Sequence, residues 1–174
     1  SITTIGDDAF SDCTSLQNLI IPELIIKIGD RALRRCESLQ YVVIPDSVTI
    51  IGNRAFDSCK VLQSIVIPKS VTEIGKWAFE SCSSLQSIVI PNSVTTIEEN
   101  TFAHCSSLKN ITIPQGLSTI RNSAFLGCSS LISIDIPTTV TNIEKKAFKA
   151  CTGLKEFKGK FASDDGHCLI VDGI

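Results

Sequence analysis

The sequence has no methionine and very few histidines, tyrosines and tryptophans. It contains no methionine, one tryptophan, one tyrosine and two histidines, His104 and His167. It has no phosphate-binding glycine loop, no GxSxG elbow and no CxxC pair. His104 precedes Cys105, and its side chain should point away from that neighbour, so we predict a surface histidine. Because no convergent catalytic set is visible, we expect a non-catalytic protein without a cofactor or metal.

The charge balance and the hydrophobic runs exclude two further classes of partner. Lys and Arg number 16 against 18 Asp and Glu, so no basic field would attract nucleic acid. No apolar run approaches the roughly 18 residues of a membrane span, so we expect no membrane insertion by this stretch. No signal peptide is visible. Because the sequence begins at Ser1 halfway through a repeat, we expect it to be a piece of a longer protein.

A period of 23 residues dominates what the sequence does contain. Cysteines recur at this spacing at positions 13, 36, 59, 82, 105, 128 and 151. Isoleucine, leucine, proline and phenylalanine keep the same spacing in columns of their own, with Leu33 replacing one phenylalanine. A fixed period of this length is typical of a stacked repeat architecture.

One repeat, residues 85–107, predicts the local structure of all of them. Residues 85–90 are rich in β-branched side chains and precede Pro91, which predicts a strand ended by proline. Residues 93–97 predict a second extended segment, and a short helical piece should follow it. Phe102 and Cys105 would share one face of that piece. The turn before it opens with a residue suited to a helix N-cap, and these residues are Asp7, Asp30, Asn53 and Asn122. The first three of them follow a glycine that permits a tight bend, namely Gly6, Gly29 and Gly52.

A single repeat cannot bury its apolar face, but stacked repeats can. We therefore predict a repeat solenoid: a parallel β-sheet on one face, with short second strands and short helical turns on the other. Residues 1–157 would form the repeats, the first of them partial, and residues 158–174 would start a truncated hairpin-like module.

The repeat unit IPxSVTxIGxxAFxxCxxLxx resembles the BspA-like, or Treponema pallidum-type, leucine-rich repeat. The resemblance covers roughly residues 1–157, and the tail resembles a module found in such proteins from gut Bacteroides. It implies a right-handed leucine-rich repeat superhelix. It also implies a bacterial cell-surface or secreted protein associated with adhesion to host proteins and other cells.

The cysteine column admits three interpretations: packing thiols, disulfides or metal ligands. Neighbouring cysteines would lie within bridging distance, but parallel side chains on adjacent repeats seldom give the required dihedral angle. Seven members would also leave one unpaired. We predict that Cys13 to Cys151 are reduced thiols stacked in the core, and Cys168 stands outside the column.

The strand side chains that face away from the core are the candidate binding surface. One row carries polar residues and Tyr41, and the next row is apolar until it reaches Thr112. Contiguous exposed apolar residues often mark an interaction surface, although β-branched residues also stabilise strand pairing by themselves. The candidate site residues are Tyr41, Val43, Ser64, Val66, Ser87, Val89, Asn110 and Thr112. The expected partner is a host-matrix or cell-surface protein, and a glycan is less favoured; a purely structural spacer is the alternative function.

A second bias lies near the C-terminal end of the repeats. Six lysines fall within 16 residues there, namely Lys145, Lys146, Lys149, Lys155, Lys158 and Lys160. They suit a solvated cap, or a surface for an acidic polymer.

Overall fold

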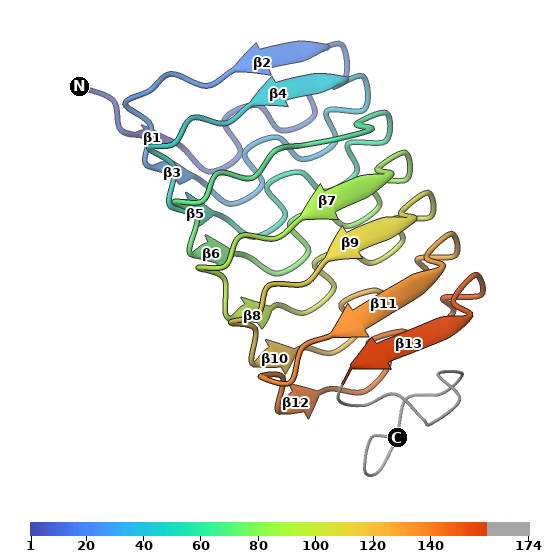
Figure 1. Cartoon of the computed structure of the whole chain (residues 1–174). Helices are drawn as coiled ribbons and strands as arrows, with labels where there is room; N and C mark the ends of the chain where they lie inside the picture. Colours follow the sequence, from blue (N-terminus) through green and yellow to red (C-terminus); the bar gives the residue numbers. More distant parts are fainter. Residues whose placement is uncertain (160–174) are drawn as a thin grey trace.

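The computed structural model describes residues 1–159, which form a parallel β-solenoid (Figure 1). Each repeat makes one turn of the solenoid, here called a rung. His167, Cys168 and the predicted hairpin-like module beyond Gly159 lie outside the described residues.

Two rows of short strands run along the solenoid. The first row, whose strands end before the prolines, contains β2 (Asn18–Ile20), β4 (Tyr41–Val43), β7 (Ser87–Val89), β9 (Asn110–Thr112), β11 (Ser133–Ile136) and β13 (Glu156–Gly159). The second row contains β1 (Thr4–Ile5), β3 (Lys27–Ile28), β5 (Ile50–Ile51), β6 (Glu73–Ile74), β8 (Thr96–Ile97), β10 (Thr119–Ile120) and β12 (Asn142–Ile143). The predicted pair of extended segments per repeat is therefore confirmed.

Strand pairing is parallel and follows the sequence period. Ile5 pairs with Ile28, and Ile28 pairs with Ile51, each 23 positions further along. In the first row, β2 pairs with β4, β7 with β9, and β11 with β13. Residues 64–66 occupy the place of a strand but join the described sheet only through a bridge between Ser64 and Ser87. The period of the sequence thus sets the register of the strand pairs in both rows.

The predicted helical turns are wrong: the described residues contain no helix. Two residues in each turn, such as Asp8 and Asp12, have left-handed backbone with φ of 57° and 58°. A right-handed helix cannot include them. Alternate N–H groups of the turn donate to the next rung instead; the N–H of Phe56, for example, bonds the carbonyl of Ala78 at 2.8 Å. Hydrogen bonds between rungs therefore replace those within a helix.

The aspartates predicted as N-caps also bond between rungs. The carboxylate of Asp7 accepts a hydrogen bond from the N–H of Asp30 at 2.8 Å, and the Asp30 carboxylate accepts one from the N–H of Asn53 at 2.9 Å. Gly29 and Gly52, which precede Asp30 and Asn53, are needed for close approach rather than for a left-handed bend. A Cβ built on Gly52 would lie 2.6 Å from Oδ1 of Asp30. The side chain of one rung therefore packs directly against the glycine of the next.

The core consists of the predicted columns. Phe56, Phe79, Phe102, Phe125 and Phe148 stack with ring centroids 5.3 to 5.6 Å apart and nearly parallel planes. Leu33 continues this column and is fully buried. Such stacks add to the hydrophobic stabilisation of adjacent rungs.

The seven cysteines of the column are free thiols, as predicted, and six of them are buried. Each buried thiol donates to a backbone carbonyl of the preceding rung; Cys82, for example, bonds the carbonyl of Phe56 at 3.1 Å. Cys13 is the exception to the predicted core column, because it lies on the first rung and is exposed. Burial raises the pKa of the Cys36 thiol to about 11 and that of Cys105 to about 12, so both stay protonated and unreactive near neutral pH.

Candidate functional site

The candidate residues lie together on the outward side of the first row of strands. Ile20 pairs with Val43, Ser87 pairs with Asn110, and Val89 pairs with Thr112. The intervening residues Val42, Ile65 and Ile88 are buried, as the two-residue period of a strand requires. The structure therefore brings Tyr41, Val43, Ser64, Val66, Ser87, Val89, Asn110 and Thr112 onto one face.

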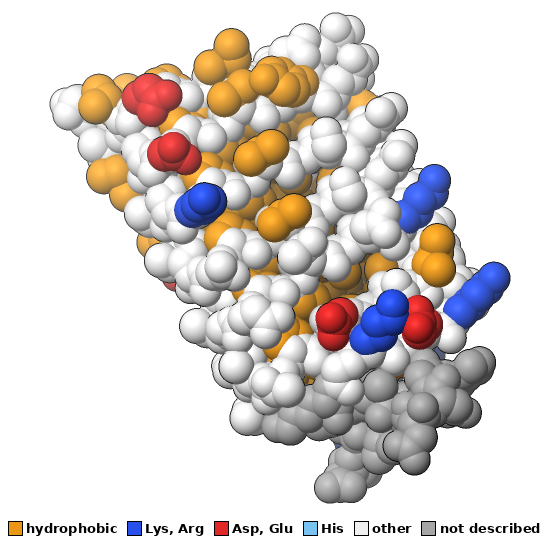
Figure 2. All heavy atoms as spheres, viewed as in Figure 1, with side chains coloured by type: hydrophobic (Ala, Val, Ile, Leu, Met, Phe, Trp, Pro, Cys, Tyr) orange, Lys and Arg blue, Asp and Glu red, His pale blue; other side chains and the backbone are white. Residues whose placement is uncertain are grey.

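Apolar side chains on this face are open to solvent. Val66 is 81% exposed, Ile20 is 73% exposed and Val89 is 62% exposed, whereas Val43 is half-buried. Figure 2 shows hydrophobic side chains gathered over the middle of this face. Most apolar residues of the chain lie in buried columns, so this row departs from the pattern of the fold.

A hollow of about 770 Å³ opens beside Val66 and Val89. Its floor contains Ile65, Ile67, Ile88, Ile90 and Ile113, together with Pro91 and Pro114. Five candidate residues line it: Ser64, Val66, Ser87, Val89 and Thr112. Tyr41, Val43 and Asn110 are on the same face but do not line the hollow.

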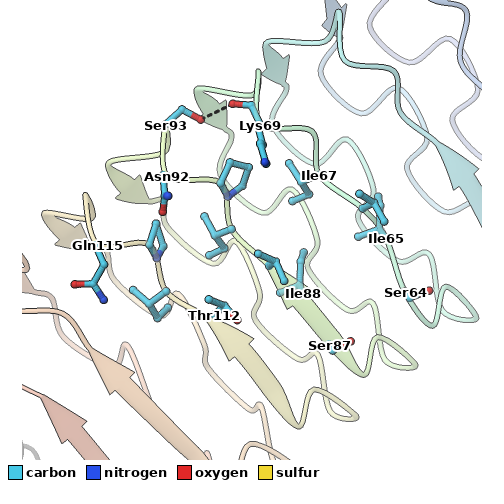
Figure 3. Close-up of a pocket in the computed structure, with 16 residues that line it drawn as sticks. Ser64, Ile65, Ile67, Lys69, Ser87, Ile88, Asn92, Ser93, Thr112 and Gln115 are labelled. Carbon is cyan, nitrogen blue, oxygen red and sulfur yellow. Dashed lines mark hydrogen bonds between the residues drawn. The ribbon is translucent and has the colours of Figure 1, made fainter.

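Sequence reasoning missed the wall of the hollow formed by the residues after the prolines. Lys69, Asn92 and Gln115 each follow a proline of the repeat and lie on the rim (Figure 3). The sequence could have indicated these residues, because the position after the proline varies from repeat to repeat whereas the proline itself does not.

Serine hydroxyls hold neighbouring rungs together behind this wall. The hydroxyl of Ser93 donates to the carbonyl of Lys69 at 3.0 Å and also to the carbonyl of Val71 (Figure 3). Ser70 makes the equivalent bond to Val48 at 2.6 Å. The backbone on which Lys69 and Asn92 are mounted is thus tied to the adjacent rung, which fixes the rim.

The sequence was compared with models of known protein families. The model described as "BspA type Leucine rich repeat region" matches residues 1–105 and 72–161, in six copies. This chain belongs to that family. No curated protein sequence matches it.

Solved structures of other leucine-rich repeat proteins resemble the chain closely. It is 34% identical to a leucine-rich repeat protein from Bacteroides ovatus, with a TM-score of 0.87 over 93% of this chain and 44% of that one. It is also 34% identical to a leucine rich cell surface protein from Faecalibacterium prausnitzii, with a TM-score of 0.86 over 95% of this chain and 48% of that one. The chain therefore spans less than half the length of these two proteins.

A third similar structure has a size closer to that of this chain. The leucine-rich repeat protein of T. pallidum is 30% identical, with a TM-score of 0.84 over 93% of this chain and 80% of that one. The resemblance inferred from the repeat unit is confirmed by these matches and by the family model.

One charged cluster interrupts the leucine-rich repeat on the turn side, away from the strands of the first row. Asp57 is only 5% exposed and lies between the guanidinium groups of Arg34 and Arg54, at 3.3 and 3.1 Å. Arg54 also contacts Glu80 at 3.3 Å and sits over the Trp77 ring. Burial, and then the Asp57 carboxylate, raise the pKa of Glu80. Since each charge has a partner, this cluster is a structural link between three rungs.

The histidine and the lysines singled out in the sequence lie on the surface of the leucine-rich repeat. His104 is exposed on its turn, as predicted. Lys145, Lys146, Lys149, Lys155 and Lys158 are all exposed, and Lys158 also contacts Glu156 at 3.3 Å. Within residues 1–159, no group of His, Cys, Asp and Glu side chains could hold a metal ion. The same residues include no helix with the length and apolarity of a membrane span.

Proposed function

We propose that this chain is a non-catalytic protein-binding and adhesion module of a bacterial cell-surface or secreted protein. The strand face would meet a host-matrix or cell-surface protein. The observation that carries the proposal is the exposure of Val66 and Val89 beside an apolar hollow. Burying each valine against a partner would contribute about 1–2 kcal/mol.

The surroundings of the hollow support a binding role. Apolar floors with a few polar groups at the rim are the usual composition of binding sites. The rim hydroxyls of Ser64, Ser87 and Thr112 make no side-chain hydrogen bond among residues 1–159, so they are free to bond a partner. The description of the Faecalibacterium relative as a cell surface protein favours the proposed location.

The test is capture of proteins from an extracellular-matrix extract by the immobilised chain. The double variant V66K/V89K places two ammonium groups on the apolar row and should abolish capture. V61K/I132K is the matched control, because both residues are exposed and neither lines the hollow. Capture unchanged by V66K/V89K, in a protein with unaltered circular dichroism, would contradict the proposal.

A structural spacer is the second candidate function. Exposed neutral glutamines recur before the strands, at Gln17, Gln40, Gln63 and Gln86, and they present no distinctive chemistry. A spacer would capture nothing from the same extract even as the unmodified chain, so one experiment separates the two functions.

A further inference from the structure

The rim of the hollow carries a single charged side chain. Lys69 is the one cation among the lining residues, and no carboxylate lines the hollow. Lys69 makes no ion pair with any other residue in the described range. Figure 3 shows its side chain extending from the rim beside Ile67. An unpaired cation beside an apolar floor favours a ligand that carries both a carboxylate and an apolar body.

The column that contains Lys69 changes sign along the solenoid. The residues after the prolines are Glu23, Asp46, Lys69, Asn92, Gln115 and Thr138. Adjacent strands lie about 4.8 Å apart, well within the roughly 8 Å over which charges interact at physiological salt. Glu23 and Asp46 would therefore repel a carboxylate from the first rungs, while Lys69 attracts it. Beyond Lys69 the rim is neutral, so the rest of such a ligand extends toward Asn92 and Gln115.

The polar groups of the rim suit a peptide backbone. Ser64, Ser87 and Thr112 supply hydroxyls, and Asn92 and Gln115 supply amides that both donate and accept hydrogen bonds. No aromatic side chain lines the hollow, so it has no flat ring on which a sugar could stack. A peptide with aliphatic side chains therefore fits this lining better than a glycan does.

We propose that the hollow binds a partner segment in which aliphatic side chains adjoin an Asp or Glu. The acidic group pairs with Lys69, and the aliphatic side chains cover Val66, Val89 and the isoleucine floor. This inference rests on the proposed protein-binding function and specifies the chemistry of the partner at that site.

Three synthetic peptides test the proposal by fluorescence anisotropy. They share the core Leu-Val-Leu, blocked at both ends, and differ only in one preceding residue: Asp, Asn or Lys. The unmodified chain should bind the Asp peptide about threefold to fivefold more tightly than the Asn peptide, as expected of an exposed ion pair. This preference should vanish in high salt.

Charge reversal provides the decisive variant. K69E should invert the order, so that the Lys peptide binds best. The fold should tolerate the change because Glu23 and Asp46 already occupy the same column. The control is K109E, which makes the same charge change at an exposed lysine outside the hollow and should preserve the preference for Asp.

The outcomes separate this inference from the proposed function. Equal binding of the three peptides, no binding of any of them, or an Asp preference that survives K69E would overturn the inference. Binding of dodecanoate or of a neutral oligosaccharide to the chain, without peptide binding, would overturn it too. If V66K/V89K nevertheless abolishes protein capture, the proposed function stands and only its chemistry is wrong.

Discussion

The thiol of Cys105 donates a hydrogen bond to the backbone carbonyl of Phe79, across 3.2 Å and 26 positions of sequence. The same bond joins Cys128 to Phe102 at 3.1 Å and Cys151 to Phe125 at 3.0 Å. The cysteine column is therefore both a packing column and a series of polar links between rungs. A residue of similar size without a donor would leave the carbonyl without this partner.

We expect Cys105→Ala to lower the free energy of unfolding by about 1–3 kcal/mol. The change removes the hydrogen bond to the Phe79 carbonyl and leaves a small cavity. Urea denaturation followed by circular dichroism measures the effect. Cys13→Ala is the control, because Cys13 is exposed and should change stability by less than about 0.5 kcal/mol. Equal effects of the two variants would contradict a structural role for the buried thiol.

The stability penalty of Cys105→Ala should shrink as the pH rises above 9. Burial raises the pKa of Cys105 from 9.0 to about 12, so above pH 9 the unfolded chain releases a proton that the folded chain keeps. The contribution of this thiol to the free energy of unfolding is fully present below pH 9 and is lost as the pH rises toward 12. The loss is about 1.4 kcal/mol per pH unit. The alanine variant lacks the group, so its penalty should fall by about 1.4 kcal/mol between pH 8 and pH 10, most of it above pH 9. A penalty that stays constant from pH 8 to pH 10 would rule out this linkage.

Gly52→Ala should destabilise the solenoid by about 1–3 kcal/mol. The added Cβ would lie 2.6 Å from Oδ1 of Asp30 and 2.7 Å from the backbone carbon of Gly29, so adjacent rungs must separate. Thermal unfolding provides the measurement. Gly6→Ala is the matched control, since a Cβ at Gly6 meets no atom within 4 Å. If the two melting temperatures fall equally, close packing of the rungs is not the reason for glycine at this position.

Asp57→Ala should cost about 1–3 kcal/mol of stability, because it leaves Arg34 and Arg54 without their shared carboxylate. The two guanidinium groups are partly exposed, which keeps the cost below that of a fully buried pair. Asp12→Ala provides the comparison. Asp12 contacts Arg35 at 3.6 Å with both side chains more than half exposed, so its removal should cost at most about 0.5 kcal/mol. Denaturation midpoints that coincide for the two variants would show that the Asp57 cluster does not link the rungs.

The repeat columns could be predicted from the sequence, because residues 23 positions apart have equivalent surroundings in a solenoid. Once the cysteines establish the 23-residue frame, the pairing of Ile28 with Ile51 and the stacking of Phe79 on Phe102 follow directly. The candidate binding face could also be placed, since alternation along the strand exposes Val66 and Val89 while burying Ile65 and Ile88. Their role as a binding site remains a prediction.

The turns could not be read in the same way. Phe102 and Cys105 are three residues apart, which is compatible with one face of a helix. The turn instead uses left-handed residues at Asn100 and His104, with φ of 55° and 61°. Local sequence favours the helix in such a case, but the neighbouring rung supplies carbonyls to the N–H groups of Asn100 and His104. Those acceptors exist only after the rungs have stacked.

The sequence by itself determined the period, the register of the strands and the identity of the core columns, because each depends on which residues recur every 23 positions. Only the tertiary structure decided the left-handed turns, the links from Asp7 and Asp30 to the following rungs, and the hollow bordered by Lys69. These features arise from contacts between repeats. Such contacts depend on how closely successive rungs approach, and no single repeat specifies that distance.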